Sequence, residues 1–562
     1  PLNKEEVLDH FNKTFDFAKS QMGSAQEIAL RLTPLKDVYY THDTTFDFNP
    51  KGHRETNYVL LGIAFLILFI AGINFTNLTT SLIPLRLKTI NTHRVLGCSI
   101  YKLRAISLIE SIVICLISYI LALFIVNDLS YTPIANWVDA DIRLSQYKGL
   151  ILLTALIAIL TGCLAGLYPA IRSTSYAPAL VLKGSFGLSP KGKKVRVALI
   201  GFQYTVSIAL IIVTLFMGLQ NHFMTSSEQL GFNKDQVAIV NLTPEIYAKH
   251  KPQYIQKLKD YPGIEDVAFS VYELSKEDDM IDLEYARHED KDVFFKVFYA
   301  SENFLSVMDI QVEEGRDFTR EDLNKAQSDY IINPAAERDF HLHPGDRFND
   351  RTVLGVSKDF RFNSCRIASS PFVFALNNDI PNPKLVSYIR FNSKTNLQEA
   401  VAHVRETLKE IDPTFPFEIS FYNTILNNLY QKEQTLGKLI SLFGIMAILI
   451  SIVGVFGLVL FETQYRRKEI GIRKINGATT GQILLMFNKT YIRIVSVCFI
   501  ISIPIAWMGT QQWLENFAYK TPLHLWVFIV AFLIILSVTI GTVTFPNWQA
   551  ANENPVNSVK SE

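Results

Sequence analysis

Long apolar segments that are almost free of charged residues recur along this chain. A helix needs about 20 mostly apolar residues to cross the hydrocarbon core of a bilayer. Seven segments meet that requirement, and Glu110 is the only acidic residue inside any of them. The pattern predicts seven membrane-spanning helices, at 58–82, 105–127, 149–171, 197–219, 439–461, 490–510 and 523–545.

The long polar region 220–438 has a different pattern. Runs typical of strands, such as DQVAIVNL, DVFFKVFYA and RTVLGVSKDF, alternate with helical runs, such as NLQEAVAHVRETLKEI. This alternation predicts an α+β domain outside the membrane. The segment 425–438, which directly precedes the fifth span, is predicted to be a helical stalk joining that domain to the membrane.

Composition agrees with a membrane protein, because 49% of the residues are hydrophobic, only 19% are charged and the mean hydropathy is positive. The five cysteines offer no CxxC spacing, so cysteine chemistry is not expected. His341 and His343 lie two residues apart, but no third metal ligand follows at a useful spacing. A solvated turn before Pro344 is the preferred interpretation, and no metal is expected.

Lysine and arginine indicate the orientation of the spans. They gather in three segments that fall on one side of the membrane if the spans alternate, namely 86–104, 183–196 and 466–481. That side is predicted to be cytoplasmic and to include the tail 546–562. The remaining segments are predicted to lie outside, namely 1–57, 128–148, 220–438 and 511–522.

The chain begins on the predicted outer side at Pro1, without an initiator methionine, a signal peptide or a leading span. The polar N-terminal stretch 1–57 needs a preceding segment to carry it across the membrane. We therefore expect an earlier span and the front of an outer domain to precede Pro1 in the parent gene.

Two parts of the chain resemble each other. A constant offset in residue number aligns Arg86, Lys88, Ile90, His93, Arg94 and Gly97 with Arg466, Lys468, Ile470, Arg473, Lys474 and Gly477. Farther along, a slightly shorter offset aligns Tyr168-Pro169 with Phe545-Pro546. Both parts run in the order span, basic helix, span, outer loop, span and proline, so one module is predicted to occur twice.

Several motifs then identify a family. RRKEIGIRKINGATTGQI (466–483) resembles the segment after the second span of MacB/FtsX-like ABC transporter permeases. INFTNLTT (73–80) and RLKTINTHRVLG (86–97) resemble the same segment in the first half of two-repeat permeases, although Thr89 and Asn91 replace its usual acid and glycine. The opening LIGFQYTVSIALIIVTLFMGLQ (199–220), EEGRDF (313–318) in the outer region and the closing PNWQAANENPVNSVK (546–560) also resemble this family.

The resemblance implies a polytopic α-helical membrane protein with a large α+β extracytoplasmic domain and two FtsX-like permease repeats. We expect the following parts: 1–57, a remnant of a first extracytoplasmic domain; 58–182, the first three-span bundle; 183–196, a cytoplasmic linker; 197–219, the opening span of the second repeat; 220–438, the MacB-like domain; and 439–562, the second bundle with its tail.

The basic segment of the second repeat is predicted to form an amphipathic helix, with Ile470, Ile472 and Ile475 on its apolar side and with Gly477 and Gly481 ending it. A basic flank that only sets topology would need no partner, and this alternative stays open. The resemblance implies instead a helix that docks on a cleft of an ATPase, with Glu469 and the basic residues pairing across the contact. The residues expected there are Arg466, Arg467, Lys468, Glu469, Ile470, Gly471, Arg473, Lys474 and Gly477, and in the first repeat Arg86, Lys88, His93, Arg94 and Gly97.

No nucleotide site is expected in this chain. GLSPKGKK (187–194) approaches the phosphate-binding pattern GxxxxGK[ST], but Lys194 stands where the Mg²⁺-binding hydroxyl belongs and no strand precedes it. No catalytic, cofactor-binding or metal-binding residue is predicted. ATP and Mg²⁺ are expected on a separate ATPase.

Polar side chains inside the spans are functional candidates by default. Glu110 lies about two turns from Arg104 and Lys102, which are candidate ion-pair partners, so a structural role and a functional role both stay open. Asn74 and Asn77 are expected to form hydrogen bonds between helices.

The resemblance implies an ABC permease subunit in the bacterial inner membrane, with its large domain in the periplasm. It would transmit force from a cytoplasmic ATPase, expected in two copies, for efflux or extraction of an envelope substrate. Two alternatives stay open: an ATP-driven regulator of a periplasmic partner such as a cell-wall hydrolase, and a membrane-anchored receptor without an ATPase. A periplasmic adaptor or target protein and membrane lipids are further expected partners, and no nucleic acid is.

Overall fold

The computed structural model describes residues 4–14, 32–41, 52, 54–137, 143–175, 190–275, 282–289, 291–325, 327–361, 363–376 and 385–553. The chain divides into two compact units, Pro1–Phe65 and Leu66–Glu562, and the division falls inside a helix. The first unit contains α1 (Lys4–Thr14), α2 (Leu35–Val38) and the start of α3 (Arg54–Ser81). Much of the predicted domain remnant 1–57 lies outside the described residues.

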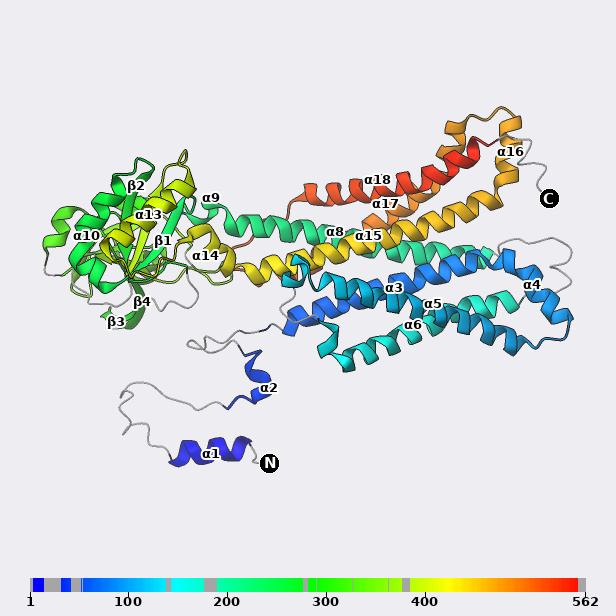
Figure 1. The fold of residues 1–562 in the computed structure, drawn as a ribbon, viewed down its shortest axis with the longest axis horizontal. Helices are drawn as coiled ribbons and strands as arrows, with labels where there is room; N and C mark the ends of the chain where they lie inside the picture. The colour runs from blue at the N-terminus through cyan, green and yellow to red at the C-terminus, as the bar shows by residue number, and fades with distance from the viewer. Residues whose placement is uncertain are drawn as a thin grey trace. The chain divides into compact units, whose positions relative to one another are not determined.

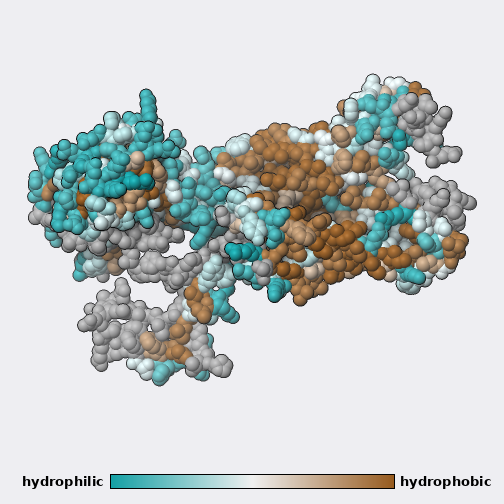
Figure 2. All heavy atoms as spheres, in the orientation of Figure 1, coloured by the Kyte–Doolittle hydropathy of each residue, from teal (hydrophilic) through white to brown (hydrophobic). Residues whose placement is uncertain are grey.

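Seven helices in the described part of the chain are long and apolar enough to cross a membrane, which confirms the predicted number of spans. They are α3, α5 (Ile100–Leu129), α6 (Lys148–Thr174), α8 (Pro190–Thr225), α15 (Gln431–Tyr465), α17 (Thr480–Leu514) and α18 (Leu525–Ala551). Apolar side chains gather along the middle of these helices (Figure 2). The chain is therefore a multi-pass membrane protein.

Four of these helices, α8, α15, α17 and α18, share one apolar core. Ile208, Phe216, Val459, Val495 and Ile535 are each fully or almost fully buried in it. The helices of the first half pack differently, because α5 and α6 lie side by side through small residues (Figure 1). A Cβ added to Gly166 of α6 would lie 2.6 Å from the Cβ of Ser111 on α5.

Helices α8 and α15 run antiparallel to each other (Figure 1). Small residues spaced seven apart on α15 face residues spaced seven apart on α8. Gly437 lies against Asn221, Gly444 lies against Thr214, and Ser451 Oγ is 3.1 Å from Ser207 Oγ. Such spacing keeps one face of each helix in contact with the other over several turns. The pair extends from the membrane segments to the β-rich domain.

The predicted α+β domain is confirmed, and its described residues form an 11-stranded mixed sheet. Its strands follow the order β11-β1-β10-β2-β4-β9-β6-β8-β5, with β3 beside β4 and β7 beside β8. They are β1 (Val237–Leu242), β2 (Ile264–Ser270), β3 (Asp282–His288), β4 (Lys291–Ala300), β5 (Val312–Gly315), β6 (Tyr330–Ile332), β7 (Arg347–Phe348), β8 (Arg351–Ser357), β9 (Phe372–Leu376), β10 (Leu385–Phe391) and β11 (Ser420–Phe421).

Most neighbouring strands are antiparallel, as in β1 and β10, where Val237 lies opposite Arg390. The pairs β4–β9 and β6–β8 are parallel. Helices α10 (Pro244–Lys259) and α13 (Leu397–Ile411) pack together on this domain (Figure 1), where Tyr254 and Val404 are fully buried. Shorter elements complete the domain and the loops: α9 (Ser227–Leu230), α11 (Phe304–Met308), α12 (Pro334–Phe340), α14 (Tyr422–Leu429), η1 (Pro133–Trp137), η2 (Leu144–Gln146) and η3 (Arg320–Asn324).

The predicted stalk 425–438 is not one helix. Helix α14 ends at Leu429, Tyr430 lies between the two helices, and α15 begins at Gln431. The Tyr430 side chain is completely buried and bonds to a loop of the β-rich domain, so tertiary contacts hold the break.

Candidate functional site

The two predicted docking helices are α4 (Ile83–Val95) and α16 (Arg467–Ile475), and both lie at the ends of the membrane helices away from the β-rich domain (Figure 1). Each ends in the same turn. Gly97 and Gly477 have φ of 91° and 88°, a conformation that glycine adopts without steric cost. The amide after each glycine donates to a carbonyl five residues earlier, Cys98 to His93 and Ala478 to Arg473. This is the hydrogen-bond pattern of a Schellman motif.

The next helix starts in the same way in both repeats. Ser99 caps α5 by accepting from the amide of Lys102, and Thr479 caps α17 by accepting from the amide of Gln482, both at 3.3 Å. Gly481, which was predicted to end the basic helix, instead lies in the first turn of α17. The cap at Thr479 begins the new helix two residues earlier, so that prediction was wrong.

The two turns also match in exposure. Residues 91–100 and 471–480 show the same order of buried, half-buried and exposed positions. Val95 and Ile475, the last residues of α4 and α16, are 69% and 65% exposed. Each repeat therefore presents an apolar side chain at the tip of a basic helix.

The predicted apolar side of α16 is only partly correct. Ile470 is buried, at 2% exposed, and Gly471 beside it is buried too. Ile472 and Ile475 are 47% and 65% exposed, so the three isoleucines do not share one buried face. Residues 470, 472 and 475 stand too far apart around a helix of 3.6 residues per turn for one neighbour to cover them all.

The charged residues of α16 are held mostly by neighbours in the same chain. Arg473 pairs with Glu469 at 2.7 Å, Arg466 with Glu462 at 2.9 Å, and Arg467 with Glu553 at 2.5 Å. Lys468 is exposed and Lys474 is half-buried. Glu469 was expected to pair with a partner protein; here it stabilises its own helix, and its role in docking stays a prediction.

In the first repeat, Arg86 forms a two-pronged ion pair with Glu110, with both N–O distances at 2.8 Å. Glu110 was expected to pair with Arg104 or Lys102, and that expectation was wrong for this structure. Arg104 Nε instead donates to the hydroxyl of Thr174 at 3.0 Å. Arg86 lies on α4 and Glu110 on α5, so an arginine 24 residues away along the chain is a closer partner than those on the same helix.

The remaining predicted residues of α4 lie at its end. Arg94 donates to the carbonyl of Thr174 at 3.2 Å and so ties α4 to the end of α6. His93 and Gly97 are exposed. Lys88 lies within α4, and its side chain is outside the described part of the structure.

Of the nucleotide-like stretch 187–194, residues 187–189 lie outside the described part of the structure, and the remaining residues begin α8.

The opposite ends of α8, α15 and α17 meet at the base of the β-rich domain. Met224 near the end of α8, Tyr430 before α15 and Phe517 after α17 are at most 3% exposed. They pack with Cys365, which belongs to the segment between β8 and β9. Burial raises the pKa of the Cys365 thiol, which keeps it neutral in this apolar cluster.

We call the four buried residues Met224, Cys365, Tyr430 and Phe517 the base cluster. An ion pair lies beside it. Arg366 Nε donates to Glu433 of α15 at 2.7 Å, and Glu433 is only 8% exposed. The Arg366 guanidinium also lies 4.7 Å from the centre of the Phe517 ring. The pair thus links the β-rich domain to α15 and the loop after α17 at one point.

The loop after α17 is also held by hydrogen bonds. The Tyr519 amide donates to the Cys365 carbonyl at 3.0 Å, and the Tyr519 hydroxyl accepts from the amide of Ser369 at 3.2 Å. Gln220 of α8, completely buried, donates to the Tyr519 carbonyl at 3.0 Å and accepts from the amide of Thr521 at 2.8 Å. Sequence reasoning did not single out these residues as functional, because their partners are distant along the chain.

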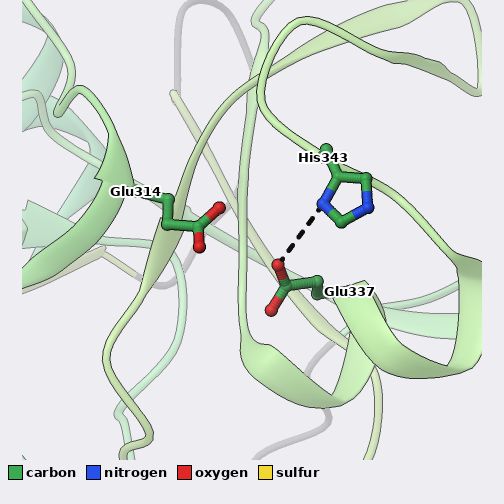
Figure 3. A group of neighbouring side chains, drawn as sticks. All are labelled: Glu314, Glu337 and His343. Atoms are coloured by element: carbon green, nitrogen blue, oxygen red, sulfur yellow. Dashed lines mark ion pairs between the residues drawn. The ribbon is translucent and has the colours of Figure 1, made fainter.

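Figure 3 shows Glu314, Glu337 and His343, whose ligand atoms lie within 4.8 Å of one another. The sequence spacing showed no third ligand for His343, but in the fold β5 and α12 bring the carboxylates of Glu314 and Glu337 to it. That no metal binds stays a prediction. His343 Nδ1 is 3.6 Å from Glu337 Oε1, an ion pair when the imidazole is protonated. Glu314 and His343 are exposed, and His341 is not part of the group.

Comparison with known families matches the FtsX-like permease C-terminal family to residues 61–178 and 441–555. The starts of the two matches are separated by the first offset of the predicted repeat, and their ends by the second, shorter one. The repeat prediction is therefore confirmed.

The relatives include the macrolide export ATP-binding/permease proteins MacB of Aggregatibacter actinomycetemcomitans and of Neisseria gonorrhoeae. The first is 25% identical over 212 residues, covering 35% of this chain and 32% of that protein. The second is 25% identical over 223 residues, covering 37% and 34%. The chain thus spans about a third of the length of these relatives.

Two solved structures are also similar to parts of the chain. The periplasmic region of MacB from Actinobacillus actinomycetemcomitans gives 15% identity and a TM-score of 0.27, covering 35% of this chain and 94% of that one. The extracellular domain of the noncanonic ABC-type transporter YknZ from Gram-positive bacteria gives 16% and 0.24, covering 32% and 96%. This chain therefore contains two FtsX-like permease regions, one in each repeat, and is a distant homologue of the MacB proteins.

Proposed function

We propose that this chain is the permease subunit of a bacterial inner-membrane ABC transporter and transmits force from a cytoplasmic ATPase to its β-rich domain in the periplasm. The work would be efflux or extraction of an envelope substrate. The observation that carries this proposal is the matched pair of turns at α4 and α16. Two exposed helix tips of the same geometry, one in each repeat, fit two copies of one partner.

The partner is proposed from the chemistry of these tips and from the relatives. Val95 and Ile475 each offer an exposed apolar side chain beside basic residues, a combination that suits a cleft with an apolar floor and acidic rim. The MacB relatives are named as ATP-binding and permease proteins. We propose that ATP and Mg²⁺ bind to a separate ATPase and not to this chain.

The path of the force follows from the continuity of two helices. Helices α15 and α17 flank α16, each contains 35 residues, and both lead to the base cluster. At 1.5 Å per residue, each helix extends about 50 Å. A displacement of α16 would shift α15 and α17 relative to each other and so reach the segment of the β-rich domain that holds Cys365 and Arg366.

Reconstitution tests this proposal. The chain is purified together with a candidate ABC ATPase, and ATP hydrolysis is measured in liposomes with and without the chain. We expect two ATPase copies to bind per chain and hydrolysis to change when the permease is present. Absence of binding together with unchanged hydrolysis would contradict the proposal.

The same liposomes separate transport from regulation. Release of labelled lipid, peptide or lipoprotein that requires ATP supports extraction or efflux. Hydrolysis that depends on the chain, without release but with activation of a periplasmic cell-wall hydrolase, supports the regulatory alternative instead.

A further inference from the structure

A direct contact between the two repeats lies between α3 and α15. Asn74 of α3 is 6% exposed, and its Nδ2 donates to the carbonyl of Ile450 on α15 at 2.6 Å. The expected hydrogen bond of Asn74 between helices is therefore present. Asn77 is buried as well, but its Nδ2 has no hydrogen-bond partner among the described residues.

The side chain of Asn74 occupies the space next to Gly454, where a side chain at position 454 would lie. A Cβ added to Gly454 would lie 2.1 Å from Asn74 Oδ1 and 2.5 Å from Asn74 Cγ. One turn farther along, a Cβ on Gly457 would lie 2.1 Å from Leu78 Cδ2. The two helices therefore approach closely because α15 has glycine where α3 has side chains.

The residues in this contact occupy equivalent positions in the two repeats. At the offset that relates the two basic helices, Asn74 is equivalent to Gly454 and Ile70 is equivalent to Ile450. Two related halves bring equivalent residues together only where the helices cross their symmetry axis. Asn74 and Gly454 therefore face each other at the pseudo-twofold axis of the chain, where the two repeats differ in a complementary way.

We propose that Asn74 and Gly454 are a matched pair that makes each first repeat join a second repeat and not another first repeat. If two first repeats met here, two asparagines would compete for the space that one now fills. If two second repeats met, two glycines would leave a void and no side-chain hydrogen bond to Ile450. This inference concerns assembly of the chain and does not depend on the proposed ATPase.

The test exchanges the two residues and measures the apparent Tm of the full chain in detergent. Gly454→Asn places two asparagines at the axis and should lower the apparent Tm by at least about 5 °C. Asn74→Gly removes the hydrogen bond and should lower it less. In the exchanged variant, Asn74→Gly with Gly454→Asn, the new asparagine faces the equivalent carbonyl of Ile70, so most of the loss should be recovered.

Gly541 supplies the matched control, because it lies in the membrane helix α18 and no atom is within 4 Å of a Cβ added to it. Gly541→Asn introduces the same residue without crowding and should change the Tm by no more than a degree or two. The proposal is overturned if Gly454→Asn behaves like Gly541→Asn, or if the exchanged variant is no more stable than Gly454→Asn alone.

A second measurement covers variants that remain folded. Two differently tagged copies of the chain are expressed together and one tag is captured. We expect wild type and the exchanged variant not to capture the other tag, and Asn74→Gly to capture it, because two first repeats can then meet without crowding. Equal capture by all variants would contradict the role in partner choice.

Discussion

The two repeats share their turns but differ in how the following helices pack. Helix α17 buries a stripe of nine residues, which starts with Ile483, Phe487, Tyr491 and Val495 and lies in the core shared with α8. The equivalent positions of α5 are Leu103, Ser107, Ser111 and Cys115, and α5 buries only Leu103 and Ser111. Its small residues instead allow close contact with Gly162 and Gly166 of α6.

The comparison shows which features of a repeat depend on adjacent residues and which depend on the neighbouring helices. A turn that needs a glycine at positive φ and a hydroxyl cap is built from adjacent residues, so both repeats keep it. A buried stripe depends on the neighbouring helix, and the two repeats have different neighbours. Under the proposed function, the second repeat is expected to transmit more of the force, because its α17 is held in a four-helix core and contacts the base cluster.

The largest effect is expected at the exposed helix tips. Ile475→Glu should abolish most of the increase in ATP hydrolysis caused by the chain, by roughly 30-fold for a loss of about 2 kcal/mol of contact energy. Val95→Glu, the same change at the equivalent position, should have a clearly smaller effect. Hydrolysis in liposomes measures both. Equal losses would show that the repeats contribute alike, and no loss in either would argue against docking at these tips.

The buried ion pair at the base cluster should have the next largest effect. Arg366→Met leaves Glu433 buried without its cation, which should cost about 3 kcal/mol in the free energy of unfolding. Arg86→Met is the matched control in the first repeat, because Arg86 and Glu110 are both more than 40% exposed and such pairs contribute less than about 1 kcal/mol. Thermal unfolding of the two variants measures the difference. Equal destabilisation would mean that burial does not distinguish the two pairs.

The glycine turns test whether the two repeats share their local energetics. Gly97→Ala and Gly477→Ala should each destabilise the chain by about 1 kcal/mol, because alanine adopts positive φ at a cost. In both cases no atom lies within 4 Å of the added Cβ, so crowding does not contribute. Equal shifts in thermal unfolding are expected; a loss confined to one repeat would show that its surroundings, and not its turn, dominate.

The caps should have the smallest effect. Ser99→Ala and Thr479→Ala should each cost about 1 kcal/mol or less, with Thr479 costing slightly more because Gln482 also bonds back to its amide. Hydrogen exchange at the first turns of α5 and α17 would detect the loss even where the Tm barely changes. Unchanged exchange in both variants would show that tertiary contacts, not the caps, hold these turns.

Features that depend on neighbouring residues were predicted well. The spans, the repeat and the helix end at Gly477 follow from length, offset and a glycine after a basic helix, and all three are present. The exposure of Ile472 and Ile475 was not predicted, because an apolar side chain on a short helix indicates a contact surface without showing whether this chain or a partner covers it. The break at Tyr430 was missed for a similar reason, since no proline or glycine marks it.

The amino-acid sequence alone specified the membrane spans, the duplicated module and the shape of the two turns, because hydrophobic length and backbone conformation depend on adjacent residues. Only the tertiary structure decided which polar groups meet. Asn74 and Ile450 are 376 residues apart, and Arg366 and Glu433 are 67 apart. Nothing in either segment indicates its partner, because each contact forms where helices and loops from different parts of the chain pack together and exclude solvent.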